Sequence, residues 1–239
     1  MDASANVTAS PMRRFILILA AVCAQTALLA EPLVKDTNPI RLFNGRDLTG
    51  LTLFTGNDRG PVWKAEDGLL RNRGAGRGYI RTHQAFSDYH LRVEWRWPAK
   101  PGNSGVMVNI TGPDVVWPKC FECQLANGRA GDFAFFSDAR AKEEIVSRNP
   151  SGMSTGRLPR DPAAGAIEKP AGEWNVYDIV VAGDTITLSV NGVQVNRITG
   201  ATPSGGMIAF QAEGAPIDFR NIELTPLPAA KDLNAPMPK

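Results

Sequence analysis

Residues that most often carry metal, redox or nucleic-acid chemistry are scarce in this sequence. Only two histidines and three cysteines occur among 239 residues, so a structural zinc site built from Cys and His ligands is not expected. The formal net charge is +2, and no block of basic residues interrupts the chain. We therefore expect no nucleic-acid partner and no attraction to an anionic membrane surface.

Two of the cysteines, Cys120 and Cys123, have the C-x-x-C spacing, which alone is a weak sign of redox or metal chemistry. The residues around them alternate as in a β-strand, where side chains three positions apart point to opposite faces. The pair is therefore not expected to form a disulfide or to bind one ion together.

The N-terminal segment has the pattern of an export signal. Arg13 and Arg14 precede an apolar stretch at 15–22, and small and apolar residues follow at 27–30, as in the three regions of a signal peptide. The apolar stretch is too short to be a convincing membrane span, so no stable membrane insertion is expected. We predict a signal peptide at 1–30 and a periplasmic or secreted protein, with a buried N-terminal helix as the alternative.

After this signal, most of the chain alternates between apolar and polar residues. At 88–97, Leu91 and Val93 fall on one side while Arg92 and Glu94 fall on the other, which is the pattern of a half-buried strand. Further segments of strand character lie at 104–110, 120–125, 174–182, 185–190, 193–198, 206–211 and 217–225. We count about eleven or twelve strands and no confident helix.

Turn residues separate these segments. Asp67-Gly68 and Asn191-Gly192 are pairs that favour the positive φ angles of tight hairpins, and Gly183-Asp184 is a third turn. Many short strands joined by such turns predict an all-β fold, a two-sheet antiparallel sandwich or jelly roll. We predict a linker at 31–40, one β-sandwich domain at 41–226 and a Pro-rich tail at 227–239.

One long connection interrupts the strand pattern at about 137–170, where Gly, Pro, Ser and charged residues prevail. Connections of this length are uncommon in compact domains and often act as lids or binding loops. A disordered surface insertion is the alternative.

The polar sides of the strands suggest a binding face. Its candidate members are carboxylates, amides and an arginine that we expect on one polar sheet face: Glu94, Arg96, Asn103, Asn109, Glu122 and Gln124. A sandwich has a wet outer face in any case, so an ordinary solvated face is the simpler interpretation.

Three details favour a site for carbohydrate on this face. Small residues surround Asn103 at a strand start, where a ligand can approach the backbone. Glu122 and Gln124 project from one face about 7 Å apart, and Trp117 offers a surface on which a sugar ring can stack. Carboxylates and amides hydrogen-bond sugar hydroxyls well, and a carboxylate can also move protons.

Ordinary glycoside hydrolysis requires two carboxylates that flank the scissile bond. The residue two positions after Glu122 is Gln124, an amide. Glu94 is a candidate partner from another strand, although the sequence does not place it. The residues alone therefore do not predict a standard glycosidase.

One recognisable motif is Phe121-Glu122-Cys123-Gln124-Leu125. Further motif segments lie, in order along the chain, at 42–48, 63–68, 89–96, 103–106, 172–175 and 211–222. With these segments the sequence resembles the 3-keto-disaccharide hydrolase domain family, whose fold is that of the concanavalin A-like lectins and glucanases. The resemblance extends from about residue 42 to residue 224.

The resemblance implies cleavage of glycosides whose sugar carries a ketone at carbon 3, on the concave face of the sandwich. The ketone acidifies the proton at carbon 2, so one base and an electrophile that holds the enolate are sufficient. Glu122 would be the base or a metal-side carboxylate. Gln124, Asn103 and Gln211 would hold sugar hydroxyls or the ketone, and Arg220 would stabilise the enolate or pair with Glu213.

The sequence also departs from the family pattern. Asn109 stands where many relatives have Arg, and Ala126-Asn127 stands where many have Asp; Asp132 is a candidate to compensate as an acidic group. Substrate contacts are thus expected from Asn103, Asn109, Glu94, Gln211, Glu213 and Asp132. No cofactor is implied with certainty, and a divalent metal held by oxygen ligands stays open.

Other interpretations of these residues remain. The domain could be a non-catalytic lectin-like module, or a sandwich that mediates protein contacts at the cell envelope. Arg220 could belong to a structural Arg–Glu pair in the final strand. Trp63, Trp95 and Trp174 are expected in the core, and His83 and His90 on the surface.

Overall fold

The computed structural model describes residues 38–56, 63–74, 76–143 and 156–228. The predicted signal peptide, most of the predicted linker and nearly all of the Pro-rich tail lie outside these ranges. No helix within the described ranges is long and apolar enough to cross a membrane.

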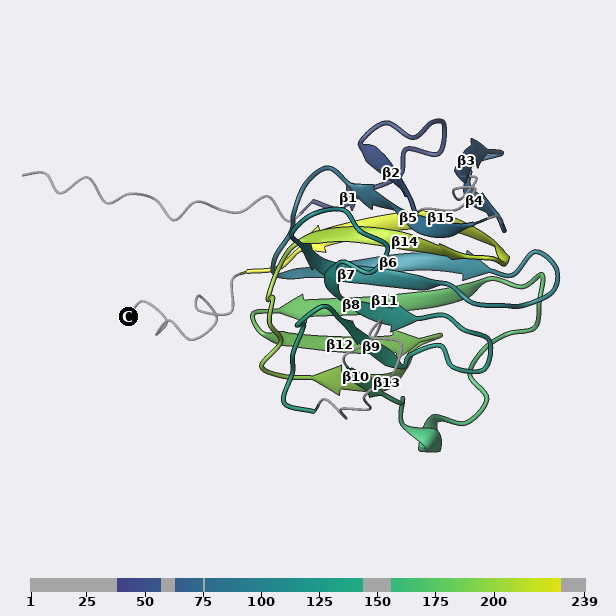
Figure 1. Ribbon diagram of the computed structural model, residues 1–239. Coiled ribbons are helices and arrows are strands. Elements are labelled where there is room, and N and C mark those ends of the chain that lie inside the picture. The colour runs from purple at the N-terminus through teal and green to yellow at the C-terminus, as the bar shows by residue number, and fades with distance from the viewer. Residues whose placement is uncertain (1–37, 57–62, 75, 144–155, 229–239) are drawn as a thin grey trace, which may run out of the picture. The chain divides into compact units, whose positions relative to one another are not determined.

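The described residues form fifteen strands and one short 3-10 helix, η1 (Pro162–Ala164) (Figure 1). The strands are β1 (Ile40–Arg41), β2 (Leu51–Thr55), β3 (Trp63–Glu66), β4 (Leu69–Arg73), β5 (Arg77–Thr82), β6 (Tyr89–Arg96), β7 (Gly105–Thr111), β8 (Lys119–Gln124), β9 (Phe133–Phe136), β10 (Gly156–Leu158), β11 (Asn175–Ala182), β12 (Thr185–Val190), β13 (Val193–Ile198), β14 (Met207–Glu213) and β15 (Pro216–Pro226).

These strands make two antiparallel sheets. The first sheet has the order β13-β12-β11-β6-β15-β4-β3, with β1 paired to β15, and the second has the order β10-β9-β8-β7-β14-β5-β2. In Figure 1, β7 to β10 of the second sheet overlie strands of the first. The predicted all-β sandwich is confirmed.

The two strongest predicted hairpins occur where expected. Asp67 and Gly68 join β3 to β4 with φ angles of 52° and 75°, and Asn191 and Gly192 join β12 to β13 with φ angles of 50° and 82°. Two consecutive positive φ angles give a turn whose twist matches that of the paired strands.

The core lies between the sheets. Leu91, Val93 and Trp95 of β6 are fully buried in one cluster with Val106 and Phe121 of the second sheet. Each of these side chains contributes roughly 1.5–3 kcal/mol by leaving water. The alternate residues on every strand therefore point to the outer face of their own sheet.

Strand pairing sets one row of side chains on the outer face of the second sheet. The pairs Arg157↔Ala134, Ala134↔Glu122, Glu122↔Met107 and Met107↔Ala209 run across β10, β9, β8, β7 and β14. Directly paired residues share a face. This row contains Glu122, so it positions the candidate site.

The long connection predicted at 137–170 is described only in part. Its described portions hold β10 and η1, while 144–155 lie outside the described residues. The expectation of a segment without β structure is wrong at β10, because three residues are too few to show an alternating pattern.

Candidate active site

Glu122 is a buried carboxyl on the outer face of the second sheet. Its neighbours Phe121 and Cys123 point into the core, so Glu122 points away from it, with 2% of the residue exposed. Gly105 makes room for the carboxyl, because a Cβ there would lie 2.3 Å from Oε1 and 2.5 Å from Cγ of Glu122. Any larger residue at position 105 would displace the Glu122 side chain.

Gln211 connects Glu122 to a second carboxyl. With its amide oriented toward the two acids, the Gln211 nitrogen lies 3.0 Å from Oε1 of Glu122 and 3.3 Å from Oε2 of Glu213. Asn103 donates from Nδ2 to the same Glu213 oxygen at 2.6 Å. We call Asn103, Glu122, Gln211 and Glu213 the carboxyl–amide cluster.

Neighbouring bonds fix this cluster. The buried Ser104 hydroxyl donates to the backbone oxygen of Gln211 at 2.8 Å, which ties the start of β7 to β14. Oδ1 of Asn103 is buried and accepts no hydrogen bond from the described residues. A buried acceptor without a partner is costly, so a ligand donor such as a sugar hydroxyl would satisfy it.

An open hollow borders the cluster. Its volume is about 500 Å³, and it is lined by Gly76, Arg77, Asn103, Glu213 and Gly214. This volume falls in the usual range for small-molecule sites. Glu122 lies deeper than the lining residues, connected to them through Gln211.

Burial raises the pKa of both carboxyls, and the charge of Glu213 adds to the shift at Glu122. Burial, and next the negative charge of Glu213, raise the pKa of Glu122 to about 8, although Arg129 and Arg157 oppose this shift. Burial also raises the pKa of Glu213, while Arg77 lowers it. A carboxyl that titrates near neutral pH is suited to proton transfer.

Asp132 lies beside this cluster but is already paired. Its carboxylate accepts from the backbone N–H of Arg160 at 2.8 Å, from Nε of Arg129 at 3.1 Å and from the Arg157 guanidinium. Its backbone oxygen accepts from the N–H of Gln124. Asp132 therefore anchors arginines at the edge of the site and is not a free acid.

Gln124 shares the outer face with Glu122, as predicted from strand alternation. Its Oε1 accepts the backbone N–H groups of Leu125 at 2.9 Å and Ala126 at 2.8 Å. These two bonds fix the turn after β8. The amide oxygen of Gln124 is thus engaged in the protein itself.

The expectation of a single polar face is wrong for Glu94 and Arg96, because both belong to β6 of the first sheet. Arg220, expected at the catalytic site, lies on β15 of the same sheet and pairs with Glu94, Nε to Oε2, at 2.7 Å. The predicted pairing of Arg220 with Glu213 is therefore also wrong, and the structural Arg–Glu pair is present instead. Alternation reveals which face of a strand is polar, but not to which sheet the strand belongs.

Asn109 is also apart from the cluster. It is fully buried, with a φ of 56°, in the irregular part of the β7–β8 pairing. Its Nδ2 donates to the backbone oxygen of Pro203 at 3.0 Å. Asn tolerates this left-handed conformation better than most residues, so Asn109 stabilises the irregular β7–β8 pairing.

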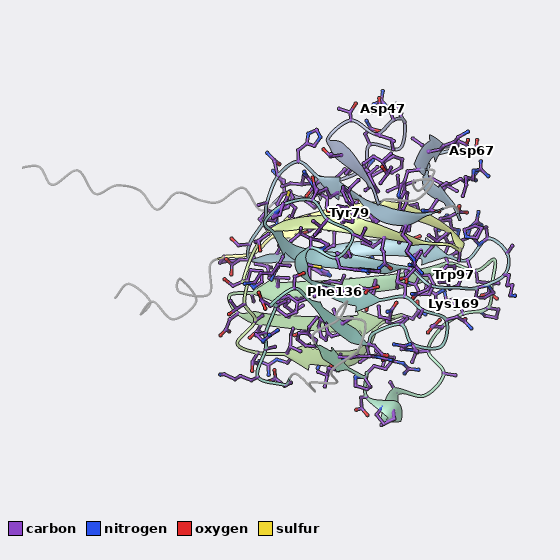
Figure 2. The ribbon with its side chains drawn as sticks, viewed as in Figure 1. Asp47, Asp67, Tyr79, Trp97, Phe136 and Lys169 are labelled. Atoms are coloured by element: carbon purple, nitrogen blue, oxygen red, sulfur yellow. The ribbon has the colours of Figure 1, made fainter. Side chains whose placement is uncertain are left out.

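Aromatic residues cover the other end of this outer face. Trp117 is half-buried and stacks on Phe136, with ring centroids 4.9 Å apart and planes at 12°. Both pack in an outer cluster with Tyr79, Met107 and Cys120, and Figure 2 marks Tyr79 and Phe136. The predicted sugar-stacking Trp117 thus lies on the face of the second sheet that carries Glu122.

The other aromatic and histidine predictions have mixed outcomes. Trp63 and Trp95 are in the core, as predicted. Trp174 is only half-buried, and the guanidinium groups of Arg96 and Arg220 lie 4.6 Å and 4.0 Å from its ring centroid. His90 is partly exposed and contacts Asp178 at 2.8 Å.

Cys120 and Cys123 are buried and free, and they point to opposite sides of β8, as predicted. Cys123 belongs to the core and Cys120 to the outer cluster. Within the described ranges, no group of three or more His, Cys, Asp or Glu residues could hold a metal ion. The carboxyl–amide cluster offers two carboxylates, with the Gln211 amide between them.

Two functional candidates escaped the sequence reasoning. Arg157 falls on the three-residue strand β10, inside the segment predicted as a loop. Arg77 starts β5 and reaches the hollow beside Glu213. Neither position has a local pattern that distinguishes it from a surface arginine, so only the strand pairing brings them to the site.

Comparisons with known proteins agree with this architecture. The family model described as a 3-keto-alpha-glucoside-1,2-lyase-like domain matches residues 38–225. The 3-keto-disaccharide hydrolase of Bacteroides thetaiotaomicron is 26% identical over 165 residues, which are 64% of this chain and 55% of that protein. The chain thus spans about half the length of this relative.

Solved structures share the fold at low identity. A Parabacteroides distasonis protein, described as a candidate glycosyl hydrolase, is 20% identical with a TM-score of 0.58, covering 80% of this chain and 94% of that one. The carbohydrate-binding module CBM66 of Bacillus subtilis is 12% identical with a TM-score of 0.54, covering 74% and 96%. At these identities the likeness concerns the fold alone.

Proposed function

Because the chain belongs to the family of 3-keto-alpha-glucoside-1,2-lyase-like domains, we propose that it is an enzyme that cleaves glycosides whose sugar carries a ketone at carbon 3. The observation that carries this proposal is the buried Glu122 carboxyl, joined through Gln211 to Glu213 beside an open hollow. The name of the 3-keto-disaccharide hydrolase relative supports the same substrate class.

The chemistry requires one base and a group that stabilises an oxyanion. The Glu122 carboxylate takes the proton from carbon 2, and the electron pair of that C–H bond moves toward carbon 3, leaving the negative charge on the ketone oxygen. The enolate then reforms the ketone, a double bond forms between carbons 1 and 2, and the bond from carbon 1 to the aglycone oxygen breaks. The leaving oxygen takes up a proton.

Hydration completes the reaction. Water adds its hydroxyl to carbon 1, and a proton returns to carbon 2, which gives the free 3-keto sugar. The sum is hydrolysis of one glycosidic bond by one water. A pair of carboxylates on opposite sides of the scissile bond is not needed, in contrast to ordinary glycosidases.

The surroundings of Glu122 suit it to this task. A base is most effective when its pKa lies near the working pH, and the pKa of Glu122 is raised to about 8. Gln211 and Gly105 hold the carboxyl in one position. Glu213 and the unpaired Oδ1 of Asn103 would accept sugar hydroxyls at the hollow.

We also propose that the protein is exported to the periplasm or outside the cell, on the basis of the signal pattern at 1–30. N-terminal sequencing of the mature protein after cell fractionation tests this. A mature N-terminus near residue 31 would support export, and an intact N-terminus in the cytoplasmic fraction would contradict it.

A chromogenic aryl glucoside with a ketone at carbon 3 provides the direct test of the proposed activity. We expect the wild type to release the aglycone and Glu122→Gln to lower kcat by about 10²–10⁴, the usual contribution of a positioned acid or base. Glu94→Gln is the matched control, because Glu94 lies on the other sheet. A substrate with deuterium at carbon 2 should react more slowly if proton removal limits the rate.

The same assay separates the alternatives. Binding of the sugar without turnover would support a non-catalytic module. If Glu213→Gln abolishes turnover while Glu122→Gln retains it, the base is Glu213 and our assignment is wrong. Assays with and without a chelator decide whether a divalent metal takes part.

A further inference from the structure

We propose that Arg157, held by Asp132, is the cationic group that faces the ketone oxygen of the substrate and stabilises its negative charge in the enolate. This inference rests on the proposed function and names a residue for the electrophilic role that the sequence assigned to Arg220. Because Arg220 lies on the first sheet and pairs with Glu94 there, that role needs another residue.

Strand register brings Arg157 to the site. Arg157 pairs with Ala134 and Ala134 pairs with Glu122, so the arginine and the acid share the outer face of the second sheet two strands apart. That separation is about 10 Å between backbones. Only the small Ala134 stands between them in this row, and the charge of Arg157 is close enough to lower the pKa of Glu122.

The balance of charge around Asp132 depends on Glu122. One buried carboxylate accepts from the guanidinium groups of both Arg129 and Arg157, and both arginines also act on Glu122. Once Glu122 has taken up a proton, this group has an excess of one positive charge. The first sheet also has a buried carboxylate with two arginines, Asp218 with Arg71 and Arg96, so what distinguishes Arg157 is its place near Glu122. The excess cation beside Glu122 favours a negative charge that develops on a bound ligand.

Arg157 also has a donor to spare. Its Nη2 is engaged with Asp132, whereas its Nε is buried and donates to no atom of the described residues. Although this Nε is buried, the side chain as a whole is 38% exposed, so a ligand can contact other atoms of Arg157. An arginine stays protonated throughout, and it would therefore stabilise the enolate by hydrogen bonds without giving up a proton.

Arg129 is the weaker candidate for this role. It belongs to the turn between β8 and β9 and contacts Asp132 three positions along the chain. It has no place in the row that contains Glu122. Asp132 thus pairs with two arginines, and of these only Arg157 lies in the same cross-strand row as Glu122.

The test compares Arg157→Gln and Arg157→Lys with the control Arg92→Gln. Arg92 is also partly exposed and also bonds an aspartate, Asp178 at 3.1 Å, but it lies on the first sheet. Each Gln variant thus loses one positive charge and one contact to an aspartate. The assay measures kcat and KM for the 3-keto aryl glucoside across pH, together with thermal unfolding.

We expect Arg157→Gln to lower kcat by about 10²–10³, as when one oxyanion-stabilising donor is removed, with a smaller change in KM. Because Arg157 lowers the pKa of Glu122, the pH dependence of kcat/KM should move to higher pH in this variant. Arg157→Lys, which keeps the charge, should retain the wild-type pH dependence and recover part of kcat. Arg92→Gln should match the wild type in both respects.

Two results would overturn the inference. If the wild type is active and Arg157→Gln behaves like Arg92→Gln, Arg157 has no role in turnover and the proposed function stands without it. If the wild type does not cleave 3-keto glycosides at all, the proposed function fails, and this inference fails with it. If Arg157→Gln does not fold, the kinetics of Arg157→Lys decide. A lysine variant with the wild-type kcat and the wild-type pH profile would contradict a specific guanidinium contact.

Discussion

At the scale of single residues, two glutamates on the outer faces of the two sheets have pKa values shifted in opposite directions. Burial raises the pKa of Glu94, but hydrogen bonds from Asn221 and Arg220 outweigh burial and hold it below its ordinary value. Glu122 is buried more deeply and has Glu213 beside it, so its pKa rises to about 8. The same residue type is therefore an ion-paired carboxylate in one place and a carboxyl with a raised pKa in the other.

The raised pKa of Glu122 predicts a cost in stability that depends on pH. The unfolded chain loses this proton near the ordinary pKa of 4.5, whereas the folded protein keeps it until about pH 8. The stability contributed by Glu122 is thus fully present below pH 4.5 and falls as pH rises to 8. Glu122→Gln, which cannot ionise, should therefore unfold with a free energy about 4 kcal/mol higher than wild type at pH 8.

Chemical denaturation of both proteins between pH 4 and pH 9 checks this expectation. Glu94→Gln serves as a control with the opposite sign, because the ionised form of Glu94 is the one that the fold stabilises. Equal stabilities of the wild type and Glu122→Gln over the whole range would mean that Glu122 is not buried as described.

Removal of the neighbouring charge should have a defined effect on Glu122. Because the charge of Glu213 raises the pKa of Glu122, Glu213→Gln should lower that pKa toward its ordinary value. An NMR titration of the Glu122 carboxyl carbon in the wild type and the variant measures this. A titration that does not change, or that moves to higher pH, would show that the two carboxyls are not coupled in the way we infer.

At the scale of elements, the sequence predicted what is local and missed what is long-range. Alternation located β6, β7 and β8, and the Asn191-Gly192 pair located the β12–β13 hairpin. It could not reveal that β14 lies between β7 and β5, because that pairing joins segments about a hundred positions apart along the chain. The sequence therefore named Gln211 and Glu213 as site residues from the family resemblance, not from their place beside Glu122.

The same limit explains the misplaced Arg220. Its strand shows the expected polar alternation, but that strand is part of the first sheet. The guanidinium of Arg220 therefore contacts Glu94 and the ring of Trp174. Arg157, on a strand of three residues, showed no alternation at all. The face on which Arg157 of β10 lies is set only by the pairing of β10 with β9.

The placement of Arg220 on the first sheet yields its own prediction. Arg220→Gln should leave kcat/KM for a 3-keto aryl glucoside within about twofold of wild type, because the residue is remote from Glu122. Stability should fall by roughly 1 kcal/mol or less, since a partly exposed ion pair contributes little. Steady-state kinetics and thermal unfolding measure the two effects, and a loss of turnover without a loss of stability would return Arg220 to the catalytic role.

At the scale of the whole domain, the two outer faces differ in their ionisable groups. Ion pairs such as Arg220–Glu94 and Arg96–Asp218 neutralise charges on the first sheet. The second sheet has two carboxyls with raised pKa values, one of which lines an open hollow. Among the described residues, the carboxyls with raised pKa values therefore lie on one of the two outer faces.

The family match over residues 38–225 covers both sheets, so the domain as a whole is the unit to which the proposed activity belongs. The fold could be predicted from periodicity and turns because these are set by neighbours along the chain. The site could be predicted only in part, since Glu122 and Gln124 are local to one strand, while Gln211 and Glu213 come from β14 and Arg157 from β10.

The most direct test of the central claim, that Glu122 is the base, is the pH dependence of kcat/KM for the wild type with a 3-keto aryl glucoside. A base must be ionised to accept a proton, so kcat/KM should rise with pH and level off above a midpoint near 8, the pKa of Glu122 in the free protein. A value of kcat/KM that is constant between pH 6 and 9, or that falls above pH 8, would contradict the account.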